Sequence, residues 1–432
     1  MKIYLYPDQA EWGALTQRPV QKLDQLRAGV QQTFDLVQQR GDSALMELAV
    51  KFDKAALQNV WVSPEEITAA LPQVSEELKA AIELAYNNIY RFHNAQQEQV
   101  KQVETMPGVT CWRKSVGIQK VGLYIPGGTA PLFSTLLMLG IPAQIAGCRE
   151  IILATPPSAD GTINGTILYT ANRLGIKRIL KAGGAQAIAA LAFGTETVPA
   201  VDKIFGPGNQ YVTAAKQMVT QMGVAIDMPA GPSEVLVIAD DSADANFVAA
   251  DLLSQAEHGP DSQVVFVTNS EKQLQNVQAA VAQQVAQLPR QTVAEQALNN
   301  SIGVVLPTLE EAIHFSNLYA PEHLILSVDQ PEPLAEQVIQ AGSVFMGHFS
   351  PESVGDYASG TNHTLPTNGY ARNYSGVSLD SFVKKITFQQ LTREGLERIG
   401  PAVETMAEAE GLHAHKNAVT VRLRKMNPSL SS

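Results

Sequence analysis

The chain has 432 residues, 45% of them hydrophobic, and a formal net charge of −11. This length allows a large buried core and predicts roughly two or three globular domains. The negative charge and the lack of a Lys/Arg-rich tract argue against nucleic-acid binding, and no apolar run approaches the roughly 18 residues that cross a bilayer. The first residues also lack a basic segment followed by an apolar run, so we expect a cytoplasmic protein that acts on a small molecule and binds no membrane.

The first hundred residues are expected to be helical scaffold. Apolar stripes within residues 1–60 indicate two or three surface helices. Ser63 opens a capping box with proline at the first helical position, and Ser75 starts a longer helix. His93 lies beside the apolar stripe of that helix without polar companions nearby, so we interpret it as structural or solvated.

Short strands alternate with helices from about residue 114 onward, which predicts two parallel sheets. The first series has strands at 121–125, 150–154, 178–181 and 201–205 and helices near 131–146, 163–174, 185–193 and 210–219. The second has strands near 234–239, 263–267, 303–306, 323–327 and 343–346 and helices near 243–257, 270–287, 308–318 and 332–341.

Loops rich in Gly and Pro follow three strands of the first series, at 125–128, 182–185 and 205–209. Ligands of open α/β sheets bind at the carboxyl ends of the strands, where glycines let backbone amides approach a phosphate or a ring. These loops suit a nucleotide. Neither Gly-x-Gly-x-x-Gly nor a Walker A sequence occurs, however, because Tyr211 stands where the third glycine of the nearest candidate belongs.

A loop, a strand and a helix follow one another between residues 226 and 263. The helix ends at Gly259-Pro260, and its last turn carries Gln255 and His258. Residues three apart share a helix face, so these two side chains could meet one small ligand or metal ion. The alternative is that both are capping and surface polar groups, since His suits the end of a helix dipole.

Further polar residues follow in two later segments. Glu322 and His323 directly precede a strand and could enter a crevice and act in two different proton transfers, or could be a capping carboxylate and a satisfied histidine. Residues 347–370 form a long polar loop with Asp356 and His363, and loops of this length are more often functional than incidental. His348 in the same loop is a structural candidate.

The last segment has a helix near 402–409 followed by Glu410, Gly411, His413 and His415. A His-x-His pair beside a glutamate is typical of a metal site, yet such a pair alone is more often a solvated helix boundary. Cys111 and Cys148 are too few for a disulfide framework. We expect both to be reduced, packed and non-nucleophilic.

Eight segments together resemble the histidinol dehydrogenase family, and the resemblance runs essentially from end to end. They are VGLYIPGGTAPLFST, AGGAQAIAALAFGTE, KIFGPGNQYV, IDMPAGPSEVLVIAD, DLLSQAEHGPDSQ, YAPEHL, SVGDYASGTNHTLPT and EGLHAHKNAVTVR. Members of that family are zinc-dependent, NAD-linked enzymes. They oxidise L-histidinol through the aldehyde to L-histidine in two steps, the last chemistry of histidine biosynthesis.

The resemblance implies a role for each of the polar residues. One Zn²⁺ per subunit would be bound by Gln255, His258, Asp356 and His415. The acid/base pair would be Glu322 and His323, and the substrate would contact Ser233, His363 and Glu410 as well as His323 and the zinc ligands. The NAD contacts would be Tyr124, Gln186 and Asn209. The His-Lys-Asn-Ala-Val run favours His415 over His413 as the ligand.

The fold class expected is α/β, with two doubly wound, incomplete Rossmann-like parallel-sheet domains plus small helical N- and C-terminal extensions. Residues 1–22 would be an N-terminal extension and 121–234 the α/β domain with the NAD-contacting loops. Residues 23–120 with 235–372 would form the discontinuous α/β domain with the catalytic and zinc residues. The resemblance implies a homodimer with shared active sites, and residues 373–432 leave the strand–helix alternation, so we expect an exchanged tail through which the partner chain supplies Glu410 and His415. The alternative is a tail folded back on its own subunit.

Two other functions fit the residues alone. A zinc-dependent hydrolase acting on an amino-acid derivative would use the same His, Asp, Gln and Glu side chains to activate water. A non-catalytic two-domain binding protein that closes on an amino acid would need neither metal nor cofactor.

Overall fold

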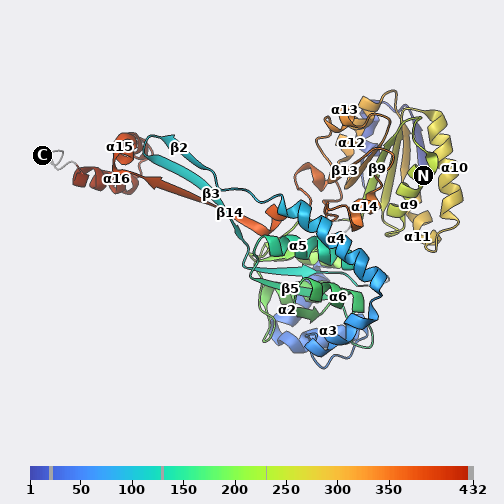
Figure 1. Cartoon of the computed structure of the whole chain (residues 1–432), viewed down its shortest axis with the longest axis horizontal. Coiled ribbons are helices and arrows are strands. Elements are labelled where there is room, and N and C mark those ends of the chain that lie inside the picture. Colours follow the sequence, from blue (N-terminus) through green and yellow to red (C-terminus); the bar gives the residue numbers. More distant parts are fainter. Residues whose placement is uncertain (19–22, 128–130, 230, 427–432) are drawn as a thin grey trace. The chain divides into compact units, whose positions relative to one another are not determined.

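The structure is a computed structural model that describes residues 1–18, 23–127, 131–229 and 231–426. The chain forms two compact units, drawn in Figure 1. The first consists of Met1–Gln96 and Ile118–Phe382, and the second of Gln97–Gly117 and the chain from Val383 onward.

Five parallel strands form one sheet of the first unit, in the order β6–β5–β4–β7–β8. Their bounds are Lys120–Tyr124 (β4), Glu150–Thr155 (β5), Arg178–Lys181 (β6), Lys203–Phe205 (β7) and Ala225–Ile226 (β8). Helices α5 (Phe133–Ile145) and α6 (Gly165–Arg173) contribute to the core on one face, and α7 (Gly184–Phe193) and α8 (Gln210–Thr220) to the core on the other. Because helices cover both faces, this sheet is doubly wound, as predicted.

Three N-terminal helices, α2 (Leu23–Leu48), α3 (Pro64–Ala70) and α4 (Glu76–Asn94), pack around this sheet. Phe34 of α2 is buried in the same core as Ile188 of α7, and Ile89 of α4 shares a core with Leu136 of α5. The predicted grouping of 23–120 with 235–372 therefore differs from the structure. Apolar periodicity correctly indicates a buried helix face, but it does not tell which sheet that face covers.

Both predicted helix starts in this region are confirmed. The Ser63 hydroxyl accepts a hydrogen bond from Glu66 N (3.2 Å), and the Glu66 carboxylate accepts one from Ser63 N (2.8 Å), which completes the capping box. Ser75 caps α4 through Leu78 N. His93 is buried, with Nδ1 2.9 Å from the carbonyl oxygen of Ile89, as befits a structural histidine.

Six parallel strands form the other sheet of the first unit, in the order β1–β11–β10–β9–β12–β13. Their bounds are Lys2–Leu5 (β1), Glu234–Ala239 (β9), Gln263–Thr268 (β10), Ile302–Val305 (β11), His323–Ser327 (β12) and Ser343–Met346 (β13). Helices α9 (Ala245–Ala256), α10 (Glu271–Val285) and α11 (Gln291–Asn299) share one core with the sheet, while α1 (Gln9–Leu15), α12 (Leu309–Tyr319) and α13 (Glu332–Ala335) share the opposite one. This sheet is doubly wound as well.

The N-terminal extension differs from the helical one expected. It begins with β1, whose Lys2 pairs with Ile302 as an edge strand of the six-stranded sheet. A strand of four residues with a partly exposed pattern carries too little periodicity to be separated from helix in a sequence. Helix α13 covers Glu332–Ala335 only, shorter than the predicted 332–341, and α11 was not predicted.

The second unit is not only helical either. Strands β2 (Gln102–Met106), β3 (Val109–Gly117) and β14 (Val383–Leu391) form an antiparallel sheet in the order β14–β3–β2. Helices α15 (Arg393–Ala409) and α16 (His413–Met426) pack against each other, and Gly400 lies beside Leu423. The tail expected at 373–432 thus begins its own structure at Val383 and shares a sheet with residues 102–117.

The remaining short elements lie in loops of the first unit. Single helical turns cover Ala49–Asp53, Leu71–Gln73, Tyr370–Arg372 and Leu379–Phe382, and α14 (Glu352–Tyr357) lies within the long polar loop. Among the helices in the described ranges, none combines the length and apolar character that a membrane span requires.

Candidate active site

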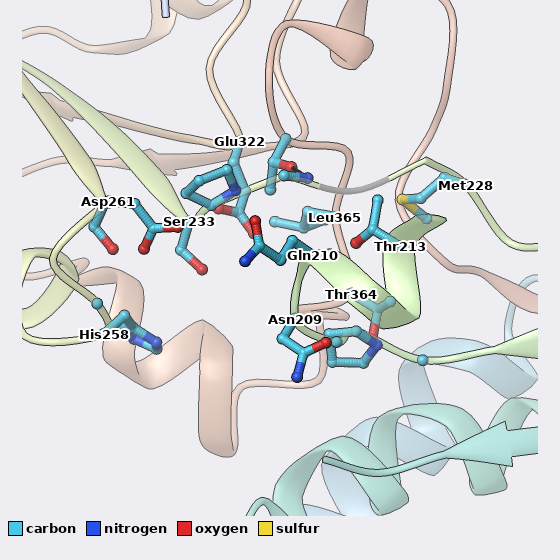
Figure 2. Close-up of a pocket in the computed structure, with 18 of the residues that line it drawn as sticks. Asn209, Gln210, Thr213, Met228, Ser233, His258, Asp261, Glu322, Thr364 and Leu365 are labelled. Atoms are coloured by element: carbon cyan, nitrogen blue, oxygen red, sulfur yellow. Dashed lines mark hydrogen bonds between the residues drawn. The ribbon is translucent and has the colours of Figure 1, made fainter. Parts of the chain in front are cut away.

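A cleft of about 390 Å³ in the first unit gathers loops from both parallel sheets. It is lined by the loop after β7 and the start of α8, the segment before β9, the end of α9, the residue before β12 and the segment 363–367. Figure 2 shows Ser233, His258 and Asn209 around the same space. The five-stranded sheet thus offers the carboxyl end of β7, as predicted, whereas the six-stranded sheet offers the amino ends of β9 and β12.

Glu322 and His323 are buried together where β12 begins. The Glu322 carboxylate accepts a hydrogen bond from Glu234 N (2.9 Å), and its Oε2 lies 3.6 Å from His323 Nδ1. Burial raises the pKa of Glu322 to about 8, although the neighbouring imidazole works against this. Burial disfavours a charged His323, but the Glu322 and Asp356 carboxylates outweigh it and raise the pKa of the imidazole.

The other nitrogen of His323 makes no well-formed hydrogen bond to any residue that the structure describes. Nε2 is buried and lies 3.4 Å from Asp356 Oδ1, a close contact that is not a well-formed hydrogen bond. Nδ1 lies 3.3 Å from the carbonyl oxygen of Glu234. A histidine held at one nitrogen and left without a partner at the other is suited to exchange a proton with a bound molecule.

Gln255 is buried in the last turn of α9 and faces the carboxylate of Glu352. The amide orientation that satisfies both groups places its nitrogen 3.2 and 3.3 Å from the two Glu352 oxygens, so its oxygen is turned away from Glu352. Ser254 Oγ donates to the same carboxylate (2.9 Å), and Glu352 Oε2 lies 4.0 Å from His323 Nδ1. Burial raises the pKa of Glu352 to about 7.

Glu352 was not among the predicted site residues, although it lies in the long polar loop that was predicted to be functional. One of its contacts is Ser254, which lies 98 residues earlier in the chain. The other is His323, a member of the acid/base pair. The only available signal was that a carboxylate lies in a loop judged functional. Side-chain contacts over such separations leave no local pattern.

Asp356 lies in α14, and His363 lies in the loop that follows it. Burial alone would raise the pKa of Asp356, but the imidazole of His323 beside it lowers that pKa. His363 Nδ1 lies 2.7 Å from the carbonyl oxygen of Asp356, so Nδ1 donates, and Nε2 therefore accepts from the Thr135 hydroxyl at 2.9 Å. Burial lowers the pKa of His363. The ring lines the cleft with both nitrogens engaged.

The predicted zinc ligands divide between the two units. Gln255, His258 and Asp356 belong to the first unit, where His258 is exposed and lines the cleft. His415 belongs to the second unit, in the first turn of α16, and Glu410 caps the end of α15; both are exposed there. Within the described ranges, no group of three or more His, Cys, Asp or Glu side chains is arranged to hold a metal ion.

A larger cleft of about 1350 Å³ is lined by all three predicted NAD contacts, Tyr124, Gln186 and Asn209. The Tyr124 hydroxyl accepts from Gly184 N (3.1 Å), and burial raises the pKa of Tyr124 to about 12. Asn209 caps α8 by accepting hydrogen bonds from two backbone amides. Asn209 lines both clefts. Gly128 of the predicted 125–128 loop lies outside the described residues.

Among the described residues that line the two clefts there is no cysteine, and His348 is not one of them either. Cys148 is partly buried, and burial raises its pKa to about 12, so it is a thiol rather than a thiolate. Cys111 lies in β3 of the second unit. His348 contacts the hydroxyls of Ser242 (3.1 Å) and Ser327 (3.0 Å), in keeping with the expected structural role.

Comparisons with known proteins agree on one family. The family model described as histidinol dehydrogenase matches residues 16–423. A histidinol dehydrogenase from Bacteroides thetaiotaomicron is 57% identical over 426 residues, covering 99% of this chain and 100% of that protein. The histidine biosynthesis trifunctional protein of Komagataella pastoris is 54% identical over 417 residues, covering 95% of this chain and 49% of that protein. The crystal structure of histidinol dehydrogenase from Elizabethkingia anophelis has 60% identity and a TM-score of 0.97, with 99% of each chain covered. The chain therefore belongs to the histidinol dehydrogenase family.

Proposed function

We propose that the chain oxidises L-histidinol through L-histidinal to L-histidine, reducing two NAD⁺ in succession, as the final step of histidine biosynthesis. The observation that carries this proposal is Asn209, which lines both the cleft beside Glu322 and the larger cleft beside Tyr124. One residue thus joins a space for the substrate to a space for a dinucleotide, as hydride transfer between them requires. The names of the two relatives support the same substrate and pathway.

His323 is the general base for the hydroxyl proton in this proposal. Its Nε2 makes no well-formed hydrogen bond to a described residue and has only Asp356 Oδ1 beside it, at 3.4 Å. In the neutral ring this nitrogen can therefore accept the proton of a bound alcohol, and the nearby carboxylates, which raise the pKa of the ring, favour its protonated form. As the O–H bond breaks toward His323, the carbon releases a hydride to the nicotinamide and becomes the aldehyde carbon. Nδ1, beside Glu322 and the carbonyl oxygen of Glu234, keeps the ring in place for this transfer.

Glu322 is the base for the second oxidation. In its ionised form it takes a proton from a water that adds to the aldehyde, while the protonated His323 gives its proton to the former carbonyl oxygen and so becomes a base again. His323 then removes a hydroxyl proton from the hydrate while the carbon releases the second hydride, and the acid formed loses its proton to give the carboxylate. The balance is one alcohol, one water and two NAD⁺ to one carboxylate, two NADH and three protons. The hydrogen bond from Glu234 N holds the Glu322 carboxylate at the end of β12.

Zinc fits the donors that the first unit offers. Gln255, with its nitrogen held by Glu352, has its amide oxygen turned away, while His258 is exposed to the cleft and Asp356 has a lowered pKa. Nitrogen and oxygen donors of this kind suit Zn²⁺. We propose these three residues and His415 as the ligands. When bound, the ion would orient an amino alcohol and neutralise its developing negative charge.

The remaining predicted contacts keep their proposed roles. Ser233 and His363 line the smaller cleft and would contact the substrate, together with Glu410. Tyr124, Gln186 and Asn209 would contact NAD.

We also propose a homodimer in which the partner chain supplies Glu410 and His415. Both residues are exposed at the turn between α15 and α16, and apolar side chains around that turn are exposed too: Met406 is 65% and Leu412 44% accessible. An exchanged tail would bury that apolar surface.

The test is a histidinol-dependent rise in the absorbance of reduced nicotinamide, with metal analysis before and after chelation. Zinc-loaded protein should form NADH, chelated protein should not, and added zinc should restore the rate. If zinc-loaded protein forms no NADH with L-histidinol but cleaves an ester or amide of an amino acid, a zinc-dependent hydrolase is the better account.

A further inference from the structure

The segment that delivers Glu322 has an uncommon backbone. Helix α12 ends at Tyr319, and Ala320 adopts φ 54° and ψ 66°, a left-handed conformation that a non-glycine residue rarely occupies. Ala320 N donates back to Ser316 (2.7 Å), and Pro321 then leads into Glu322. The carbonyl groups of Tyr319 and Ala320 therefore point out of the helix and need other donors.

Arg18 supplies those donors from the other end of the sequence. Its Nη1 donates to the carbonyl oxygen of Tyr319 at 2.5 Å, and its Nη2 donates to that of Ala320 at 3.2 Å. The guanidinium also lies over the Tyr319 ring, 3.7 Å from its centroid. One side chain thus holds the two peptide groups directly before Pro321 and Glu322.

The same guanidinium binds Glu234 in a two-point ion pair. Nε lies 2.7 Å from Glu234 Oε2 and Nη2 lies 3.1 Å from Oε1, with both side chains nearly buried. The Tyr319 hydroxyl is 2.9 Å from Glu234 Oε2 and 2.7 Å from Gln263 Oε1. A planar fork bound at two points fixes the direction of its partner as well as its distance.

Glu234 in turn touches both members of the acid/base pair through its backbone. Its N–H donates to Glu322 Oε2 at 2.9 Å, and its carbonyl oxygen lies 3.3 Å from His323 Nδ1. Arg18 therefore fixes the Glu322 carboxylate from two directions: it holds the main chain that precedes Glu322 and the residue that donates to its carboxylate. Stability alone does not require such a pair, because apolar side chains of similar volume often replace a buried ion pair without loss.

We propose that Arg18 is a positioning residue that acts through Glu322, placing this carboxylate for the water-activating step; the inference rests on the proposed role of Glu322. Arg18 does not line the cleft that holds Glu322. Its replacement should slow aldehyde oxidation, the step that needs Glu322, more than it changes the KM for substrate.

The test compares Arg18→Met and Arg18→Lys with Arg40→Met, which breaks the exposed Arg40–Glu47 pair at the surface. With L-histidinal and NAD⁺, kcat should fall at least tenfold in Arg18→Met and less in Arg18→Lys, whose single ammonium keeps the charge without the fork. The KM for L-histidinal should change less than threefold, and Arg40→Met should behave as wild type. Arg18→Lys carries the test if Arg18→Met does not fold.

A double-mutant cycle separates positioning from general stabilisation. If Arg18 acts through Glu322, either Arg18 change should slow a Glu322→Gln enzyme less than twofold further. Multiplicative losses, or an unchanged kcat per folded molecule, would overturn the inference and leave the role of Glu322 intact. If Glu322→Gln alone oxidises L-histidinal at the wild-type rate, the proposed role of Glu322 fails, and the Arg18 inference with it.

Discussion

Glu322 and His323 are adjacent in sequence and both contact the backbone of Glu234, but they differ in what remains free. The Glu322 carboxylate accepts from the amide of Glu234, whereas only Nδ1 of His323 contacts the Glu234 carbonyl oxygen and Nε2 makes no well-formed hydrogen bond to a described residue. Glu322→Gln should therefore slow L-histidinal oxidation about 100-fold or more and alcohol oxidation much less, because only the aldehyde step needs activated water. His323→Ala should slow both steps. Stopped-flow NADH formation with each substrate measures this, and equal losses for Glu322→Gln would refute the division of roles.

A second residue of interest is Asp53, which lines the larger cleft. Burial raises its pKa to about 6, and its Oδ2 has no hydrogen-bond partner. In the unfolded chain the pKa of this carboxyl is about 3.9. As the pH rises above that value, the unfolded chain releases the proton while the folded chain retains it. The group therefore costs stability increasingly up to its folded pKa, and that cost persists above it.

Asp53→Asn removes this cost. Its thermal midpoint should match wild type near about pH 4 and exceed it near about pH 7. Asp160→Asn is the control of opposite sign, because hydrogen bonds from Thr162 lower the pKa of Asp160. A midpoint difference for Asp53→Asn that stays constant with pH would contradict the assignment of a raised pKa.

Sequence reasoning can propose a residue where its position is marked locally, and it misses residues whose partners are distant. Gln255, Glu322, Asp356 and His363 were proposed because each lies at a helix end, directly before a strand or in a polar loop. Arg18 lies 216 residues from Glu234, and no periodicity or motif connects two side chains over that distance. Their ion pair depends on the segment after α1 lying beside the start of β9, which only the folded chain shows.

At the scale of single helices and strands, the testable consequences concern the loops that follow the strands. Gly206 follows β7 with φ 123°, and a Cβ there would lie 2.0 Å from the carbonyl oxygen of Tyr124. Gly206→Ala should therefore push the loop that leads to Asn209 away from Tyr124, and because both residues line the cleft proposed for NAD, the KM for NAD⁺ should rise at least tenfold. Gly147→Ala is a matched control, because Gly147 also has positive φ (76°) but meets nothing within 4 Å.

Gly147→Ala should lower the thermal midpoint slightly, at a cost of about 1 kcal/mol, with an unchanged KM for NAD⁺. An unchanged KM in Gly206→Ala as well would show that this strand end does not shape the cofactor cleft.

Buried parallel strands could be predicted, and exposed antiparallel ones could not. Strand β9 is buried at every position, so it appears as a continuous apolar run bounded by loop residues. Strand β14 reads VKKITFQQL and is mostly exposed, so it has neither an apolar run nor a clean alternation. The antiparallel sheet of the second unit was missed for this reason.

At the scale of the whole molecule, the proposal that two subunits share each active site can be tested by mixing inactive variants. His258→Ala and His415→Ala should each be inactive, since each removes one proposed zinc ligand. If the partner chain supplies His415, mixed subunits after dissociation and reassociation should contain one site with all ligands intact, and activity should return to a substantial fraction of wild type. Zinc content should rise in parallel.

A site built within one chain predicts no recovery in this mixture. Reassociating each variant with itself is the control and should give no activity. The sequence could not predict which sheet each N-terminal helix covers, for a related reason. The apolar periodicity of a helix shows that one face is buried, but it does not show whether the covering surface belongs to one sheet, to the other sheet or to another subunit.

The most direct measurement of the central claim is the stoichiometry of a complete reaction. With limiting L-histidinol and excess NAD⁺, the account predicts two NADH and one L-histidine for each L-histidinol consumed, with no free aldehyde accumulating. One NADH for each L-histidinol, with L-histidinal as the final product, would contradict it.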